Sequence, residues 1–208
     1  YLLYWKSNKT ALEMLVYSVR QKELRRLDRM VVDEKMGVRG KTFASWSPKT
    51  NRVIWLSWNK VGEHSLFTGL PDGLDRKLLI KFSGDKIFPF PAWSPDGDWI
   101  AYATYARDGD KTNGLWKMKD SGSERYQIFP TNEITAFQWA PDGLHLAIVK
   151  KVAAQQTQQQ GKPAETKFHY QLCLIGADGN NVRQLSEEPS QILKLAWSPD
   201  GKHLLFPA

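Results

Sequence analysis

Trp93-Ser94-Pro95-Asp96-Gly97 returns along the chain at nearly regular intervals. The motif is unchanged at 197–201, carries one substitution at 139–143 (Trp-Ala-Pro-Asp-Gly) and carries two at 46–50 (Trp-Ser-Pro-Lys-Thr). In each copy a short apolar run precedes the tryptophan, and another follows the turn residues. Because proline and Asp-Gly are residues of tight turns, every copy predicts a turn between two strands.

The spacing of the copies indicates the kind of repeat. The four tryptophans, at 46, 93, 139 and 197, are separated by 47, 46 and 58 residues. The longest interval contains a polar stretch of 12 residues, Gln155–Thr166, and without it this interval is also 46 residues. A period of roughly 40–50 residues with four short strands is typical of a propeller blade, whereas a helical repeat would place apolar residues three and four apart.

Alignment on the motif divides the chain into repeat units of four strands, a to d, with the motif between a and b. We place these units at about 1–28, 42–82, 90–129, 135–185 and, in part, 193–208, with a polar Gln-rich loop insertion at 153–167. The units hold three strands, then three sets of four, then two. The sequence therefore predicts an all-β fold, a β-propeller of four-stranded antiparallel blades with about four blades present, as part of a larger propeller.

A closed ring of four blades is the alternative. It would need 193–197 to join the first unit as its missing strand a, and 203–206 would then compete with 1–5 for one position. We favour the larger propeller for this reason. Because Tyr1 falls inside an apparent strand, we also expect the chain to be cut from a longer protein.

The charged stretch 20–36 could by itself be interpreted as an amphipathic helix. The repeat argues for a strand instead, because Arg25 falls in register with three other arginines that each follow a turn between strands c and d. These are Arg76, Arg125 and Arg183.

The composition fits a packed, aromatic β-protein. The chain of 208 residues has nine tryptophans, nine phenylalanines and seven tyrosines, and such rings fill the space between packed sheets.

The 29 basic and 22 acidic residues give a net charge of +7, but no five like charges are consecutive, so we expect a solvated surface and no nucleic-acid binding. Cys173 is the single cysteine, which excludes an internal disulfide and, among apolar neighbours, predicts a buried thiol. No apolar stretch has the length of a membrane span, so any membrane association would come from regions outside this chain.

Antiparallel strands assign the connections to two faces of the propeller. The a–b and c–d turns share one face, which we call the turn face and interpret as architecture, while the b–c and d–a loops share the other, the loop face. Loops on a rigid scaffold are where binding residues usually lie. We therefore predict on the loop face a protein-binding surface of basic and aromatic residues, with ordinary loop polarity as the alternative: Arg29, Lys35, Arg39, Lys41, Lys86, Phe88, Phe90, Arg107, Lys111 and Glu133.

Signatures of catalysis and of metal binding are missing from the sequence. It contains no Gly-x-Ser-x-Gly nucleophile elbow, no phosphate-binding loop and no dinucleotide-binding glycine motif. The four histidines are far apart, and the motif aspartates precede glycine in turns, where their side chains bond nearby backbone amides. We expect this chain to be non-enzymatic, without catalytic residues, metal ligands or cofactor.

The repeat resembles that of the TolB-like β-propeller family. The resemblance rests on Trp-Ser-Pro-Asp-Gly followed by a strand, a further strand ending near Asp-Gly, and then Arg-x-Leu, as in Arg25-Arg26-Leu27 and Arg183-Gln184-Leu185. It covers nearly the whole chain and is weakest at 46–50, where Lys49-Thr50 replaces Asp-Gly. The resemblance implies a propeller used for protein–protein contact in the bacterial cell envelope, with a periplasmic or envelope-associated location.

Three functions follow from this resemblance as expectations. The first is a non-enzymatic interaction scaffold of a cell-envelope assembly that binds protein partners through the loop face. The second is the substrate-gating propeller of a prolyl-oligopeptidase-like or tricorn-like serine peptidase whose catalytic domain lies outside this chain. The third is a propeller that processes a ligand at a polar central site, for which the strand-a segments offer little besides Gln138 and Lys194.

The insertion itself generates a prediction. Deleting Gln155–Thr166 should change the free energy of unfolding by less than about 0.5 kcal/mol, because long polar surface loops cost little to close or to shorten. Urea denaturation of the shortened and original chains measures the difference. Loss of cooperative unfolding in the shortened chain would show that the insertion is packed against the fold.

Overall fold

Strands and turns, without any helix, make up the part of the chain that the structure describes. The structure is a computed structural model and describes residues 1–7, 11–31, 44–59, 63–82, 91–104, 113–131, 133–153, 168–188, 192 and 194–206.

Seventeen strands in these residues form five antiparallel sheets. The first sheet has three strands, the next three have four each, and the last has two. In chain order they are β1 (Leu2–Ser7), β2 (Ala11–Ser18) and β3 (Glu23–Val31); β4 (Ala44–Trp46), β5 (Val53–Trp58), β6 (His64–Gly69) and β7 (Lys77–Phe82); β8 (Ala92–Trp93), β9 (Trp99–Thr104), β10 (Gly114–Lys119) and β11 (Tyr126–Pro130); β12 (Ile134–Trp139), β13 (His145–Ala153), β14 (Phe168–Gly176) and β15 (Arg183–Glu188); and β16 (Ala196–Trp197) and β17 (Leu204–Leu205).

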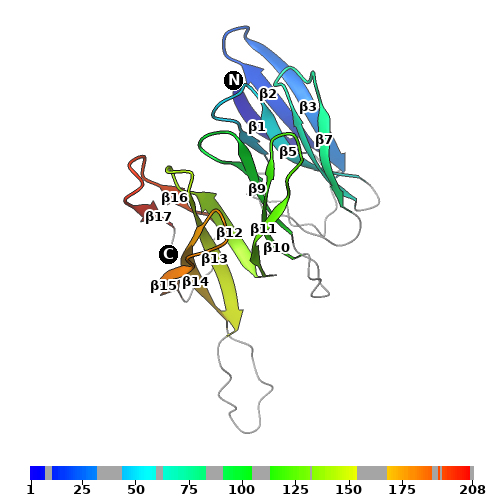
Figure 1. The fold of residues 1–208 in the computed structure, drawn as a ribbon. Coiled ribbons are helices and arrows are strands. Elements are labelled where there is room, and N and C mark those ends of the chain that lie inside the picture. Colours follow the sequence, from blue (N-terminus) through cyan, green and yellow to red (C-terminus); the bar gives the residue numbers. More distant parts are fainter. Residues whose placement is uncertain are drawn as a thin grey trace.

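The sheets follow one another as the blades of a propeller along an open arc (Figure 1). Each sheet pairs only strands that are consecutive in the chain, so every complete blade is an up-and-down meander. In the described residues, the sheet of β16 and β17 does not pair with β1. The all-β fold with four-stranded antiparallel blades is thus confirmed, and so is strand structure for the charged stretch as far as Val31.

One residue of the predicted loop-face surface lies inside a strand instead. Arg29 was expected after the first unit, but β3 continues to Val31, and Arg29 is paired with Glu13 of β2. Met30 next to it is fully buried, and the pairing of β2 with β3 continues past a register shift at Met14/Leu15 that is typical of a β-bulge. Placing Arg29 in a loop was therefore wrong.

Three copies of the repeated motif build the same turn. At 93–97, Gly97 N donates to Ser94 O over 2.9 Å, and Ser94 N donates to Trp99 O over 2.8 Å; the copies at 139–143 and 197–201 have both bonds at 2.9 to 3.0 Å. Gly97 has a φ of +72°, a conformation that glycine adopts without steric cost. Asp96 Oδ1 accepts from Asp98 N over 3.0 Å, which confirms that the motif aspartate is a turn residue.

The degraded copy at 46–50 keeps its turn by other means. The backbone N–H of Thr50 donates to Ser47 Oγ over 3.1 Å, so a serine hydroxyl does part of what Asp-Gly does elsewhere. Lys49 meanwhile reaches the following blade, where its Nζ donates to Asp98 Oδ1 over 2.5 Å. The loss of the motif aspartate is therefore accompanied by a contact between neighbouring turns.

Apolar side chains fill the space between successive sheets, and strand b of each blade contributes to the layers on both sides. In β9, Ile100 and Tyr102 face the sheet that contains β5, whereas Ala101 and Ala103 face the sheet that contains β13. Every residue of β5 is buried, as expected for a strand covered on both faces. Because tyrosinate is disfavoured without water, burial raises the pKa of Tyr102 to about 12.

The arginines that follow the c–d turns join adjacent blades. Arg76 stacks 4.0 Å from the centre of the Phe67 ring, and its guanidinium is 3.4 Å from Asp28 in the preceding blade. Arg125 donates to Leu79 O of the preceding blade over 2.8 Å. Arg183, at the matching position of the fourth blade, begins β15 and is exposed, and its side chain makes no hydrogen bond or ion pair within the described chain.

The burial of the motif tryptophans predicts unequal effects of truncation. The sequence alone treats Trp93 and Trp197 alike, but Trp93 is only 6% exposed, whereas Trp197 is half-buried in a sheet of two strands. Trp93→Ala should cost about 3–5 kcal/mol of unfolding free energy and Trp197→Ala clearly less. Chemical denaturation of both variants measures this, and equal costs would contradict the packing described.

The repeat arginines offer a matched pair of variants. Arg125→Met should destabilise by about 1 kcal/mol, because it removes a charged donor from a part-buried carbonyl while keeping much of the apolar stem. Arg183→Met removes no side-chain hydrogen bond or ion pair of the described chain and should cost less than about 0.5 kcal/mol. Thermal and urea unfolding compare the two. A larger effect at position 183 would show that its guanidinium has a partner.

Candidate functional site

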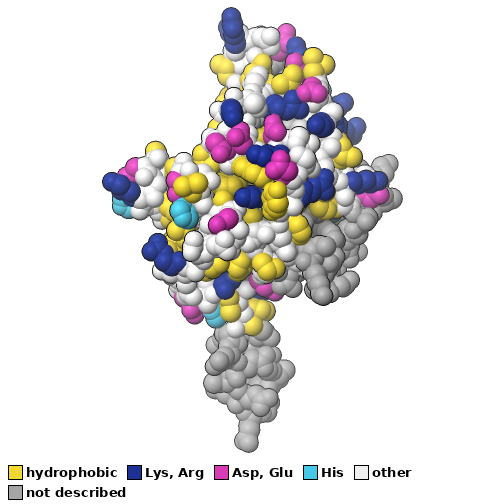
Figure 2. All heavy atoms as spheres, in the orientation of Figure 1, with side chains coloured by type: hydrophobic (Ala, Val, Ile, Leu, Met, Phe, Trp, Pro, Cys, Tyr) yellow, Lys and Arg dark blue, Asp and Glu magenta, His cyan; other side chains and the backbone are white. Residues whose placement is uncertain are grey.

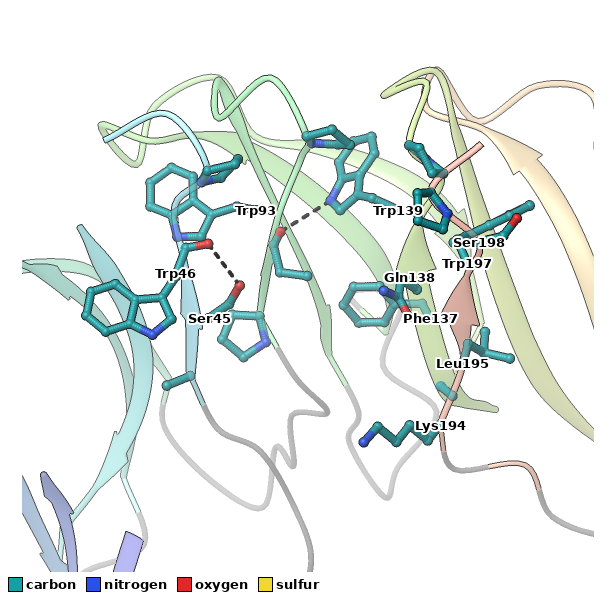
Figure 3. A pocket seen from close by; sticks show the side chains of 18 residues that line it. Ser45, Trp46, Trp93, Phe137, Gln138, Trp139, Lys194, Leu195, Trp197 and Ser198 are labelled. Atoms are coloured by element: carbon teal, nitrogen blue, oxygen red, sulfur yellow. Dashed lines mark hydrogen bonds between the residues drawn. The ribbon is translucent and has the colours of Figure 1, made fainter. Parts of the chain in front are cut away.

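The inner strands of the blades border a cavity of about 620 Å³. Its wall is formed by β4, β8, β12 and the segment at 194–199, and the four motif tryptophans lie along it (Figure 3). The motif prolines at 48, 95, 141 and 199 belong to the same wall. The repeat thus builds the channel region of the propeller as well as its turns.

Small, apolar and uncharged polar side chains dominate this cavity. Lys194 is the one charged side chain among the described residues that line it, and it is exposed. Figure 3 shows its amino group extending from the chain before β16, below Gln138 and Phe137. Gln138 and Ser45 add polar groups without ionisable chemistry. This lining suits the passage or loose binding of a ligand better than a reaction at carboxylates or histidines, which the described lining lacks.

Indole groups at this wall differ in their hydrogen bonds. Trp139 Nε1 donates to Ala92 O of the preceding blade over 3.2 Å, a contact drawn in Figure 3. The Nε1 atoms of Trp93 and Trp197 are buried and have no acceptor among the described residues. Only the first of these three indole N–H groups therefore helps to hold two inner strands together.

A second hollow, of about 480 Å³, opens on the turn face between the third and fourth blades. We call it the 3–4 groove. It lies next to the layer in which Arg183 makes no contact to the preceding blade. Aromatic, aliphatic and charged side chains line it together with backbone of two turns: Asp96, Trp99, Lys117, Trp139, Gly143, Leu144, His145, Gly176, Ala177, Asp178 and Asn181.

His145 in this groove is held by the turn that precedes it. Its Nδ1 lies 2.7 Å from Asp142 Oδ2, and Asp142 Oδ1 accepts from the backbone N–H groups of Leu144 and His145. Although partial burial opposes it, this set of hydrogen bonds lowers the pKa of Asp142. Ala140 replaces the motif serine here, so the aspartate bonds the histidine instead of a serine hydroxyl.

The described chain contains no metal-binding cluster. No three His, Cys, Asp or Glu side chains in it are placed so that they could hold a metal ion. Cys173 is buried, and burial raises the pKa of its thiol, so it is an unreactive core residue as the sequence predicted. No helix long and apolar enough to cross a membrane occurs in the described residues either.

The loop-face surface predicted from the sequence is described at only two of its ten residues. Arg29 projects from β3 with its Nε 3.9 Å from Glu13, and Glu133 is an exposed residue before β12. These two residues belong to the first and the fourth blade. The remaining eight lie outside the described residues: Lys35, Arg39, Lys41, Lys86, Phe88, Phe90, Arg107 and Lys111.

Sequence reasoning passed over the residues of the 3–4 groove because they lie on the face that we interpreted as architecture. Trp99 and Lys117 fall inside predicted strands, where an aromatic or a lysine side chain carries no signal of its own. A usable signal was the position six residues after each motif tryptophan, which varies from Arg52 to Trp99 to His145 while the motif stays nearly constant.

No family model matches the chain. Over 120 residues, 55% of its length, it is 28% identical to the uncharacterized peptidase YuxL of Bacillus subtilis, and the match spans 16% of YuxL.

Solved structures of low identity share the fold. A TolB from Agrobacterium tumefaciens superposes with a TM-score of 0.54 at 16% identity, over 96% of this chain and 71% of that one. The acylaminoacyl peptidase of Pyrococcus horikoshii superposes with a TM-score of 0.51 at 19% identity, over 72% of this chain and 25% of the peptidase. The chain therefore has the propeller fold that TolB shares with peptidase propellers, and it aligns with part of these larger molecules.

Proposed function

We propose that this chain is the substrate-gating propeller of a serine peptidase, of the prolyl-oligopeptidase-like or tricorn-like type, whose catalytic domain lies outside it. The observation that carries the proposal is the 28% identity to the peptidase YuxL over 120 residues. The likeness to the acylaminoacyl peptidase, at 19% identity, supports the fold alone.

The cavity along the inner strands fits such a role. A gate must admit extended peptides without holding them, and a wall of alanine, proline and tryptophan with few polar groups provides little directional binding. Folded proteins are too wide for a space of about 620 Å³, so a passage of this size would select unfolded or short chains. Lys194 would then add a weak preference for neutral or acidic peptides over basic ones.

The interaction scaffold of a cell-envelope assembly is the second candidate. It is supported by the motif resemblance to the TolB-like repeat and by the TM-score of 0.54 with TolB. At 16% identity this structural likeness extends to the fold alone. A periplasmic location and a protein partner belong to this candidate, and we place it second because the sequence match to YuxL favours the first.

The full-length protein tests the peptidase proposal. It should react with a fluorophosphonate probe at one serine and should hydrolyse blocked peptides. Ser45→Trp places an indole at the cavity wall, so kcat/KM for longer peptides should fall at least about tenfold, while hydrolysis of a small ester should change little. Steady-state kinetics on a peptide length series provides the measurement.

Ser123→Trp is the matched control, because Ser123 is exposed on a turn away from the cavity. It should leave the length dependence unchanged. A full-length protein that neither reacts with the probe nor hydrolyses any peptide would overturn the proposal. Equal effects of the two tryptophans would retain the peptidase but remove the gate.

A further inference from the structure

The 3–4 groove lies in the interblade layer whose c–d arginine, Arg183, makes no side-chain hydrogen bond or ion pair to the preceding blade in the described chain. Arg76 and Arg125 each reach back from a c–d turn to the preceding blade, at Asp28 and at Leu79 O. Arg183 makes no such contact in the described chain. The groove hollows this layer at the turn face, and Figure 2 shows hydrophobic side chains bordered by basic and acidic ones near the centre of the view.

Two lysines with aromatic partners stand beside this opening. Lys117 Nζ lies 4.6 Å from the centre of the Trp99 ring and 5.9 Å from that of Tyr126, and Lys119 Nζ lies 4.0 Å from the centre of the Trp99 ring. Cation–π contact with one indole keeps both ammonium groups close to the same surface. Tyr126 and Leu144 are 50% and 68% exposed, so large apolar groups adjoin these cations.

Neither lysine has a carboxylate partner in the described chain. The two carboxylates of the groove that interact electrostatically with these lysines accept hydrogen bonds within their own turns. Asp178 accepts from Asn180 N over 2.9 Å, and Asp96 accepts from the hydroxyl of Ser94. Burial is the main cause that lowers the pKa of Lys117; Asp178 opposes this shift, and Lys119 adds to it. Two neighbouring cations that repel each other and lack an ion pair would gain from an incoming anion.

We infer that the 3–4 groove is a binding site for a carboxylate carried on an apolar stem, and that its occupant is an acidic peptide segment with glutamate beside large aliphatic residues. The ammonium groups of Lys117 and Lys119 receive the carboxylate. Trp99, Tyr126 and Leu144 contact the stem and its neighbours. The site lies apart from the cavity of the inner strands and does not depend on the proposed peptidase activity.

Calorimetric titration of the full chain with a blocked peptide of alternating leucine and glutamate tests the site. The peptide should bind, an otherwise identical peptide with glutamine should bind at least about tenfold more weakly, and added salt should weaken the first interaction. Lys117→Gln with Lys119→Gln should reduce affinity for the glutamate peptide at least about tenfold. Thermal unfolding of the double variant verifies that the fold is retained.

Lys6→Gln with Lys202→Gln is the matched control, because it removes the same charge from two exposed lysines, one in β1 and one in the turn between β16 and β17. Equal weakening in the control would reduce the interaction to general attraction by a basic protein and overturn the site. So would a glutamine peptide that binds as well as the glutamate peptide. Glutarate is titrated alongside; if it binds as tightly as the peptide, the groove is a site for a free small dicarboxylate, and the assignment to a peptide segment is wrong.

Discussion

Burial of both faces of the strand that follows each motif turn is the constraint on which the structure depends. In β9 alternate residues enter two different apolar layers, and β13 does the same with Leu146 and Ile148 on one side and Ala147 and Val149 on the other. Side chains of this kind each contribute about 1.5–3 kcal/mol when fully buried. A blade is therefore stable only between two neighbours, and the turn geometry has to be the same in each blade if the layers are to match.

The cavity along the inner strands follows from this stacking. The inner strands are short and converge, so their side chains border a common space instead of a further layer. At the outer end of each layer, polar groups must close the gap between the turns. An arginine does this between the first three blades, whereas the side chain of its counterpart Arg183 makes no hydrogen bond or ion pair in the described chain, and the 3–4 groove lies in that layer. The repeated motif residues of four copies line the cavity, whereas the groove lies between two particular blades.

The repeat made the fold predictable from the sequence, because turn residues and layer residues recur at one period. The order of three, four, four, four and two strands followed from the positions of the motif, and strand structure at 23–28 followed from the register of Arg25. Strand ends were less predictable, as Arg29 shows, because they depend on burial of a neighbour such as Met30 and on a bulge. The groove was missed because its residues come from five strands and three turns, and only packing brings Trp99, Lys117 and Leu144 together.

Side chains of different chemistry occur at positions where the fold requires only a backbone hydrogen bond. The carbonyl oxygen six residues after each motif tryptophan accepts a hydrogen bond from the turn, whether the residue is Arg52, Trp99 or His145. Their side chains do different things: Arg52 bonds Asp75 of its own blade, Trp99 receives two lysines, and His145 is held by Asp142. Since the backbone bond makes no demand on the side chain, such a position can acquire a binding role without loss of the fold. The turn face, uniform in its backbone, therefore has side-chain positions that can vary without a change of the turn.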